Sequence, residues 1–345
     1  MSLLAGFVAL VGVPVFLAGC YNEPVENLAV WSEFLPLTEV RGHLDTLARF
    51  GADLYLAVRP DDLNDELRGF VSDARASGVN VRYWLQLPDN GIWVNETNAG
   101  AFVEFTSRLF AWAEGNGAPV EWVIFDMEPS IEYVQALRQA AQAGGVPALL
   151  ELLNRHRQPD EFAAARQLLQ QAVDEVHLHG ARAMSAVLPW MIDDLEDGDA
   201  DLQDMFDTPV AGITWDQVSV MLYRPIVAEL AGLPITPAYV TQYAQALKSW
   251  YPAGAQVAIG PVASAGVGTP PGYTDPLHLA MDVSAARLAG VDDISVFSLD
   301  GMVMAGGPEA WLSAAAGPTL RCGYLDLVVP EMHQLTVLFD RQIGE

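Results

Sequence analysis

Residues 120–128 read VEWVIFDME and carry the main signal for the fold. Side chains on a β-strand alternate between two faces, so Trp122, Ile124, Asp126 and Glu128 share one face. The segment is apolar on both faces until its last residues, which is typical of a strand in a parallel sheet covered by helices. Two carboxylates therefore complete an otherwise apolar face at the carboxyl end of a buried strand.

Seven further apolar runs of the same type lie along the chain, and helical patterns separate them. Eight such units in about 290 residues predict an α/β fold, a (β/α)8 TIM barrel. An open doubly wound sheet is the alternative, but no Gly-rich dinucleotide turn follows the first strand. The seven runs are residues 28–34, 52–58, 79–87, 182–190, 217–223, 256–263 and 294–300.

The interval between the fourth and fifth strands is longer than one connecting helix requires. Residues 130–180 contain two or three helical patterns, so we expect a long helical insertion that walls or caps the catalytic face. The barrel is predicted to occupy residues 27–317, followed by a short C-terminal extension over residues 318–345.

The N-terminal residues differ in character from the barrel. Residues 3–18 are uninterruptedly apolar but short for a membrane span, and Leu17-Ala18-Gly19-Cys20 follows. This ending resembles the lipobox of bacterial lipoproteins. The resemblance implies a signal peptide over residues 1–19, lipidation of Cys20, a tether over 20–26 and a membrane-anchored protein of the cell envelope. An uncleaved apolar anchor is the alternative.

Composition excludes several classes of partner and cofactor. The 345 residues include 44 acidic and 17 basic side chains, a net charge of −27, so nucleic-acid binding is not expected. With only Cys20 and Cys322 in the sequence, no disulfide framework and no thiolate zinc site are expected. We expect a monomer with no metal or cofactor and a neutral substrate. The acidic run 193–207 is interpreted as a solvated loop, with a calcium site as the alternative.

Function in a TIM barrel lies at the carboxyl ends of the strands. Two acids two residues apart on a strand repel each other, so one pKa should rise above its ordinary value. A protonated carboxylic acid at neutral pH can protonate a glycosidic oxygen. The alternative is a structural pair neutralised by Arg224 or another cation. The polar residues at strand ends are Glu33, Gln86, Asp126, Glu128, Tyr223, Arg224 and Asp300.

Five tryptophans lie at or just beyond predicted strand ends, where indole rings can stack on sugar rings. We expect two or three of them to reach the catalytic face and the others to be core. They are Trp31, Trp84, Trp93, Trp190 and Trp215.

Three segments together resemble the signature of family 18 glycoside hydrolases, the chitinases and endo-β-N-acetylglucosaminidases. They are Val123-Ile124-Phe125-Asp126-Met127-Glu128, Met221-Leu222-Tyr223 and Phe297-Ser298-Leu299-Asp300. The resemblance implies that Glu128 is the general acid/base. Asp126 would orient the substrate's N-acetyl group, which acts as the nucleophile, and Tyr223 would donate a hydrogen bond to it. The substrate-binding residues would be Glu33, Gln86, Trp190, Arg224, Phe297 and Asp300.

The sequence departs from that signature at several positions. Ile124 stands where the family has its middle Asp, and Arg224 where it usually has Asp or Asn. A non-catalytic glycan-binding or scaffold lipoprotein on a degenerate barrel is therefore the second hypothesis. Glu128-Pro129 also resembles the acid/base motif of the large clan of retaining glycosidases, which needs a second carboxylate. The seventh strand carries none, which favours the substrate-assisted mechanism.

Overall fold

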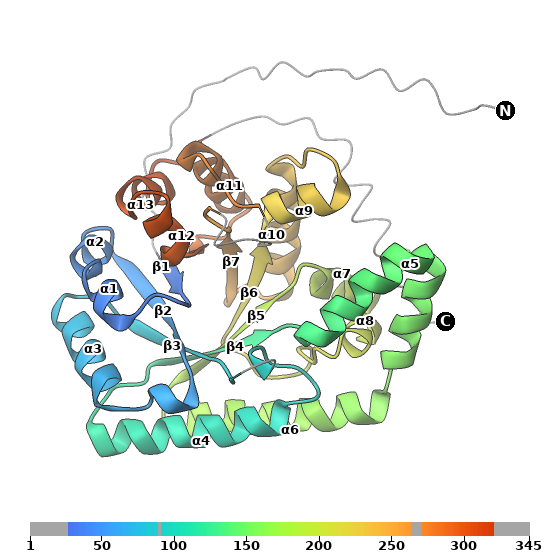
Figure 1. The fold of residues 1–345 in the computed structure, drawn as a ribbon, viewed down its shortest axis with the longest axis horizontal. Helices are drawn as coiled ribbons and strands as arrows, with labels where there is room; N and C mark the ends of the chain where they lie inside the picture. The colour runs from blue at the N-terminus through green and yellow to red at the C-terminus, as the bar shows by residue number, and fades with distance from the viewer. Residues whose placement is uncertain (1–26, 89–90, 264–270, 321–345) are drawn as a thin grey trace.

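A computed structural model describes residues 27–88, 91–263 and 271–320. Eight parallel strands form a closed barrel in sequence order, with helices around it (Figure 1). The predicted TIM barrel is confirmed, and the open sheet is wrong. The strands are β1 (Asn27–Ser32), β2 (Ala52–Val58), β3 (Val81–Leu85), β4 (Trp122–Met127), β5 (Arg182–Val187), β6 (Gln217–Leu222), β7 (Ala255–Ile259) and β8 (Asp293–Phe297).

Aromatic side chains fill the interior of the barrel. The Trp31 ring lies edge-on to Tyr55 and Trp84, with centroid distances of 4.8 and 5.0 Å. All three are buried, and the Trp31 indole N–H donates to the Ser295 hydroxyl at 2.9 Å. With Ile124 and other apolar residues they form one interior cluster. We call Trp31, Tyr55 and Trp84 the aromatic floor.

The barrel helices follow ordinary sequence rules, and α3 (Asp65–Ala76) is an example. The Asn64 side chain caps its first turn by accepting the backbone N–H of Glu66 and Leu67. Its buried residues recur at helical spacing and face the sheet. The other helical elements outside the β4–β6 region are α1 (Leu37–Arg41), α2 (Leu44–Arg49), η1 (Pro60–Asp62), α4 (Ala99–Asn116), α9 (Arg224–Ala231), α10 (Ala238–Trp250), α11 (Pro276–Leu288), α12 (Leu299–Met304) and α13 (Glu309–Ala315).

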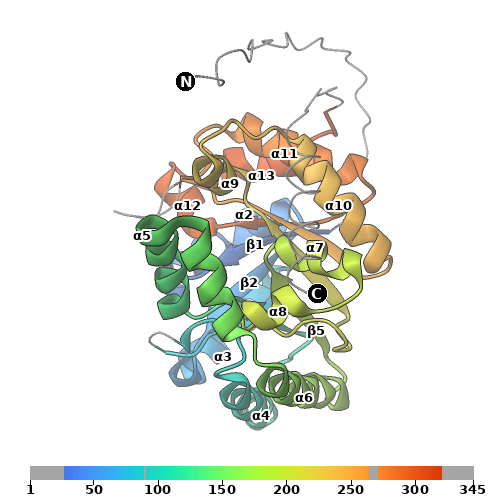
Figure 2. The same cartoon turned by 90° about the vertical axis from the view of Figure 1, so that its right-hand side faces the viewer.

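The interval between β4 and β5 contains two long helices, α5 (Ile131–His156) and α6 (Pro159–Leu178). Helix α6 lies beside α4 on the outside of the barrel, as a normal barrel helix does, so α5 is the inserted element (Figure 1). A break at Gly145, which has a φ of 61°, divides α5 into two parts. Helix α5 packs against α8 (Asp201–Met205), as Figure 2 shows from the side.

The acidic run 193–207 is not the solvated loop that the sequence indicated. It forms the end of α7 (Trp190–Asp197) and all of α8, and several of its carboxylates are buried. Asp193 accepts the Tyr243 hydroxyl at 2.9 Å, and Asp194 accepts the Gln203 amide at 2.6 Å. These acids are acceptors for neighbouring donors, which the one-dimensional charge pattern does not reveal.

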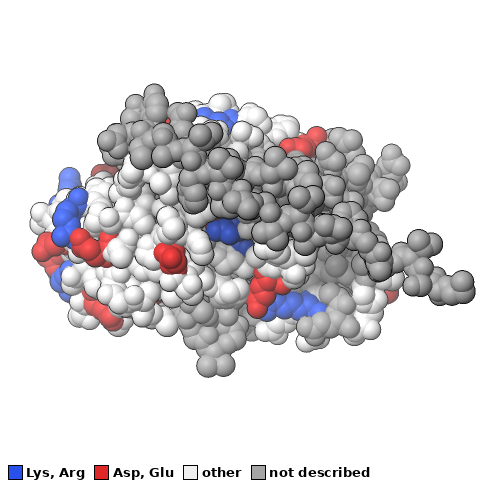
Figure 3. Space-filling view, turned by 90° about the horizontal axis from the view of Figure 1, so that it is seen from above, with Lys and Arg blue, Asp and Glu red and all other residues white. Residues whose placement is uncertain are grey.

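The predictions for residues 1–26, Cys20 included, and for residues 321–345 lie outside the described residues. Within the described part, no helix is long and apolar enough to span a membrane. Acidic and basic side chains alternate over the described surface in the view from above, without one large patch of either sign (Figure 3).

Candidate active site

The site is built on the carboxyl end of β4. Trp122 and Ile124 point into the barrel, and the two-residue period places Asp126 and Glu128 on the same face above them. Asp126 is only 4% exposed, and Glu128 is partly buried. The predicted pair of carboxylates is therefore present at the end of the barrel where catalytic groups lie.

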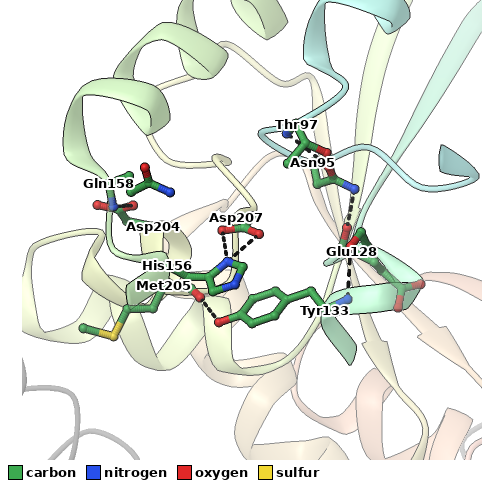
Figure 4. Close-up of polar contacts among 10 residues, drawn as sticks. Asn95, Thr97, Glu128, Tyr133, His156, Gln158, Asp204, Met205 and Asp207 are labelled. Atoms are coloured by element: carbon green, nitrogen blue, oxygen red, sulfur yellow. Dashed lines mark hydrogen bonds and ion pairs between the residues drawn. The ribbon is translucent and has the colours of Figure 1, made fainter. Parts of the chain in front are cut away.

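A loop between β3 and α4 fixes the backbone of both acids. The Val94 N–H donates to the Asp126 carbonyl at 2.7 Å, and the Glu128 N–H donates to the Val94 carbonyl at 3.2 Å. The Asn95 side-chain amide also donates to the Glu128 carbonyl, at 3.4 Å (Figure 4). Val94 thus forms a parallel bridge with Met127 beside the end of β4.

Glu33, Gln86 and Arg59 form a chain of hydrogen bonds at the ends of β1, β3 and β2. Arg59 Nη2 donates to the side-chain oxygen Oε1 of Gln86 at 2.9 Å, and the Gln86 side-chain NH2 donates to Glu33 Oε1 at 3.0 Å. Because a guanidinium has donors only, it fixes the orientation of the Gln86 amide, and the NH2 group must face Glu33. The predicted site residues Glu33 and Gln86 are therefore direct partners.

The three carboxylates affect one another's protonation. Burial raises the pKa of Glu128 to about 8, and the charge of Glu33 adds to the rise. Burial also raises the pKa of Asp126 well above its ordinary value, and the charges of Glu128 and Glu33 add to it. The Trp84 indole N–H opposes this rise as a hydrogen-bond donor, and neither it nor Asp126 Oδ1 has another partner among the described residues.

Glu33 belongs to the same electrostatic group. Burial raises its pKa to about 7, which the Gln86 hydrogen bond opposes, and the charge of Asp300 adds to the rise. The sequence predicted the raised carboxylate pKa, but from repulsion within the β4 pair. Burial is the larger cause for all three carboxylates.

Tyr223 and Phe297 complete the group from β6 and β8. Their rings stack at a centroid distance of 5.7 Å, and Phe297 also lies edge-on to Trp84. Burial raises the pKa of Tyr223 well above its ordinary value, as do the charges of Asp126, Glu128 and Glu33. The hydroxyl therefore stays protonated and can act as a hydrogen-bond donor.

Two residues that were predicted to contact the substrate bind other groups of the protein. Arg224 Nε lies 2.7 Å from Asp282 Oδ2, and its Nη1 donates to the Ile235 carbonyl at 2.9 Å. The Asp300 carboxylate accepts three consecutive backbone N–H groups, those of Glu33, Phe34 and Leu35, at 3.1, 2.6 and 3.0 Å. Asp300 thus fixes the turn that carries Glu33.

Two of the five tryptophans are core residues, as the sequence analysis expected for some of them. Trp31 and Trp84 lie in the barrel interior as part of the aromatic floor. Trp215 packs on Phe125 in the outer core, and Trp190 stacks on Phe206 at 4.4 Å among residues of α5 and α8. The structure therefore places Trp190 in a hydrophobic cluster with the insertion.

A network between the insertion and α8 supports the loop that holds Glu128. His156 Nδ1 lies 3.1 Å from both Asp207 oxygens, and the Glu96 N–H donates to the Asp207 carbonyl at 2.7 Å. The His156 ring stacks on Tyr133, whose hydroxyl donates to the Met205 carbonyl (Figure 4). Sequence reasoning missed this network, because its members come from three elements that lie far apart in the chain.

Arg59 is the other site residue that the sequence analysis missed. It directly follows β2, so the rule that selected the other strand-end residues could have found it. No group of three or more His, Cys, Asp or Glu side chains among the described residues has an arrangement that could hold a metal ion.

A separate polar cavity of about 490 Å³ lies at the opposite, N-terminal end of the barrel. There Arg82 binds Asp53 at 3.1 Å and Gln217 at 3.0 Å, and Arg182 lies over the Trp122 ring. This end of a TIM barrel serves stability, so we assign the network to closure of the barrel.

No protein-family model matches the sequence, and no curated protein does. Solved structures match in fold. The PgaB (BpsB) glycoside hydrolase domain from Bordetella bronchiseptica has a TM-score of 0.55 at 12% identity, covering 84% of this chain and 99% of that one. A GH18 chitinase from Pseudoalteromonas aurantia has a TM-score of 0.48 at 12% identity, with the same coverage. A sugar phosphate isomerase/epimerase from Parabacteroides distasonis has 0.49 at 11% identity, covering 89% and 100%.

These identities are low, so the likeness establishes the TIM-barrel fold alone. That fold hosts isomerases as well as glycoside hydrolases, and the chemistry must be argued from the side chains.

Proposed function

We propose that the protein is a glycoside hydrolase that acts on glycans containing N-acetylhexosamine. The observation that carries this proposal is the pair of the buried Asp126 and the partly buried Glu128 beside Tyr223, for which the described residues provide no ion-pair partner. A carboxyl group with a pKa of about 8 is protonated at neutral pH, as a general acid must be.

In the proposed reaction, Glu128 donates its proton to the glycosidic oxygen as the bond to the anomeric carbon breaks. The acetamido oxygen of the same sugar attacks that carbon and forms a cyclic oxazolinium ion. Asp126 orients the acetamido N–H and offsets the positive charge of the oxazolinium ion. The Tyr223 hydroxyl donates a hydrogen bond to the acyl oxygen. Water then attacks the anomeric carbon, and Glu128 takes a proton from that water. Such substrate assistance needs no carboxylate nucleophile.

The position of Glu33 supports a second mechanism for the same class of enzyme. The sequence argument against a two-carboxylate mechanism was the missing acid on β7. Glu33, which directly follows β1, acts electrostatically on both Asp126 and Glu128, so another carboxylate is near. A thiazoline mimic of the oxazolinium ion separates the two mechanisms, because it inhibits only the substrate-assisted one.

A non-catalytic glycan-binding protein remains the alternative of another class. A direct ion pair between Arg224 and Glu128 would favour this alternative, since it would keep Glu128 ionised, and an ionised carboxylate has no proton to donate. Arg224 is held by Asp282 instead, which supports the catalytic proposal.

Hydrolysis of a chromogenic chitobiose substrate tests the proposal. We expect turnover by the wild-type protein and a clearly lower rate for Glu128→Gln with an unchanged circular dichroism spectrum. Equal turnover by the two proteins would refute the mechanism, and binding without turnover by the wild type would favour the non-catalytic alternative.

We further propose that Cys20 carries the lipid and anchors a monomer at the cell envelope. Metabolic labelling with a palmitate analogue tests this, with Cys20→Ser as the unlabelled control and Cys322→Ser as the labelled one.

A further inference from the structure

Asp207 connects the inserted helix α5 to the loop that holds Glu128. His156, the last residue of α5, places its Nδ1 atom 3.1 Å from both carboxylate oxygens of Asp207. The backbone carbonyl of Asp207 accepts the Glu96 N–H at 2.7 Å. Asp207 therefore contacts the insertion with its side chain and the loop between β3 and α4 with its backbone.

The loop in turn contacts the backbone of Glu128 at two atoms. The Val94 carbonyl accepts the Glu128 N–H, and the Asn95 side-chain amide donates to the Glu128 carbonyl (Figure 4). Glu96 directly follows these two residues in the chain. A displacement of the loop at Glu96 therefore moves the backbone from which the Glu128 side chain extends.

The backbone of Asp207 depends on its contacts for its conformation. Its φ of 57° lies in the left-handed region, which residues with a Cβ atom rarely adopt, although Asp tolerates it better than most. The carboxylate is held by His156, and the Asp207 N–H donates to the Asp204 carbonyl at 3.0 Å. Loss of the His156 contact leaves this backbone freer to change, and its carbonyl can then turn away from Glu96.

The His156 ring is itself fixed, and the insertion has further contacts with α8. The ring stacks on Tyr133 with a centroid distance of 3.6 Å, and the Tyr133 hydroxyl donates to the Met205 carbonyl at 2.6 Å (Figure 4). Just beyond α5, the Gln158 N–H donates to the Asp204 carboxylate at 2.7 Å. Removal of the His156 side chain therefore breaks the connection to Asp207 without detaching the insertion.

We propose that His156 and Asp207 are positioning residues through which the insertion holds Glu128 where it can donate its proton. The inference rests on the proposed function, because it names what positions the general acid of the same site. Both residues act on Glu128 through backbone contacts and not by touching the reacting atoms. Proton donation requires close placement of the acid, so their loss should slow the reaction and leave substrate binding intact.

A matched control lies at the opposite end of the barrel. His177 Nε2 lies 2.8 Å from Asp216 Oδ2, a His–Asp contact of the same kind. The side chains of His156 and His177 are similarly exposed, at 31% and 35%. Asp216 lines the cavity at the N-terminal end of the barrel. His156→Ala and His177→Ala each remove one such contact, and only the first lies on the path to Glu128.

Hydrolysis by the full chain tests the inference with two chitobiose glycosides, one with an activated aryl leaving group and one without. For the unactivated glycoside, His156→Ala should lower kcat about tenfold and leave KM within about twofold, since misplacement by about 1 Å can cost up to about a hundredfold. The activated glycoside needs less protonation and should lose less. His177→Ala should match the wild type for both substrates.

Variants of Asp207 show whether the His156 contact itself matters. Asp207→Asn keeps an acceptor oxygen and tolerates the left-handed φ, so its kcat should stay within about threefold of the wild type. Asp207→Ala loses the acceptor and should lose at least as much as His156→Ala. The double variant should lose no more than Asp207→Ala alone, because both changes break the same contact. Thermal unfolding sets an assay temperature at which each variant is folded.

Backbone hydrogen exchange tests the connection without a substrate. The amides of Glu96 and Glu128 donate to the carbonyls of Asp207 and Val94. Both amides should exchange at least about threefold faster in His156→Ala than in the wild type, because local opening of the loop becomes easier. In His177→Ala they should exchange at the wild-type rate.

Wild-type kcat in both His156→Ala and Asp207→Ala would overturn the inference. So would equal losses for the two leaving groups, or unchanged exchange of the Glu96 and Glu128 amides. If the wild type hydrolyses neither glycoside, the proposed catalysis fails, and hydrogen exchange alone then decides whether the insertion holds Glu128. Hydrolysis without any effect of His156→Ala refutes only this inference.

Discussion

Arg224 Nε lies 2.7 Å from Asp282 Oδ2, and no ion pair among the described residues joins this guanidinium to Asp126 or Glu128, the carboxylates at the end of β4. The preceding residue, Tyr223, interacts electrostatically with those same carboxylates. Two adjacent residues at the end of β6 thus serve different purposes. One belongs to the site, and the other joins α9 to α11.

The Arg224–Asp282 pair should contribute strongly to stability only when both partners are present. Asp282 is fully buried and also accepts the Tyr273 hydroxyl. Arg224→Met or Asp282→Asn should each lower the free energy of unfolding by about 3–5 kcal/mol, because each leaves a buried group without its partner. Urea denaturation measures this. The double variant Arg224→Met/Asp282→Leu should recover part of the loss, and additive losses would contradict the assignment.

Asp300 should act as a structural acceptor for the turn that carries Glu33. Its replacement by Ala leaves three backbone N–H groups without an acceptor and should cost at least about 2 kcal/mol of stability. Asp300→Asn keeps one acceptor oxygen and should lose less. Thermal unfolding provides the measurement, with the exposed Glu309→Gln as the control. If Asp300→Ala unfolds at the wild-type temperature, the turn does not depend on this carboxylate.

Glu128→Gln should lower kcat by roughly 10²–10⁴-fold, the usual contribution of general acid/base catalysis. The loss should be smaller for an aryl glycoside with an activated leaving group, which needs less protonation, than for an oligosaccharide. Glu132→Gln is the matched control, since Glu132 is an exposed acid in the first turn of α5. Equal losses for both leaving groups would argue against proton donation by Glu128.

The raised pKa of Glu128 also predicts how stability depends on pH. The folded group keeps its proton up to about pH 8, whereas the unfolded group loses it near the ordinary value of 4.5. Between these values the folded state binds more protons, so the stability that this group contributes is lost as pH rises.

Glu128→Gln should therefore raise Tm relative to the wild type at about pH 8 and leave it unchanged at about pH 4. A gain of about 1 kcal/mol corresponds to roughly 2–4 °C in a domain of this size. Differential scanning calorimetry at both pH values tests this. A difference in Tm that is the same at both pH values would show that the group does not titrate between them.

The sequence predicted the eight strands because each carries a local apolar pattern that needs no knowledge of its neighbours. It also predicted Asp126 and Glu128, since the two-residue period of one strand places them on one face. Both predictions depend on short-range geometry alone.

The contacts of individual side chains were not predictable in this way. The pairing of Arg224 with Asp282 depends on how α11 packs against the end of β6, and the residues are 58 positions apart. Asp300 likewise meets Phe34 across 266 positions. The sequence analysis interpreted the acidic run 193–207 as a solvated loop. The buried donors that bind its carboxylates come from other segments, so the run alone does not reveal them.

The edge-to-face packing of Trp31 on Tyr55 and Trp84 supplies a spectroscopic signature for the barrel. Asymmetrically fixed aromatic rings whose centroids lie 4.8–5.0 Å apart couple their electronic transitions and produce near-ultraviolet circular dichroism. That signal originates directly beneath the carboxylates and depends on the closed strands that hold the rings. A variant that loses turnover but keeps this spectrum has lost chemistry, whereas one that loses both has lost the barrel.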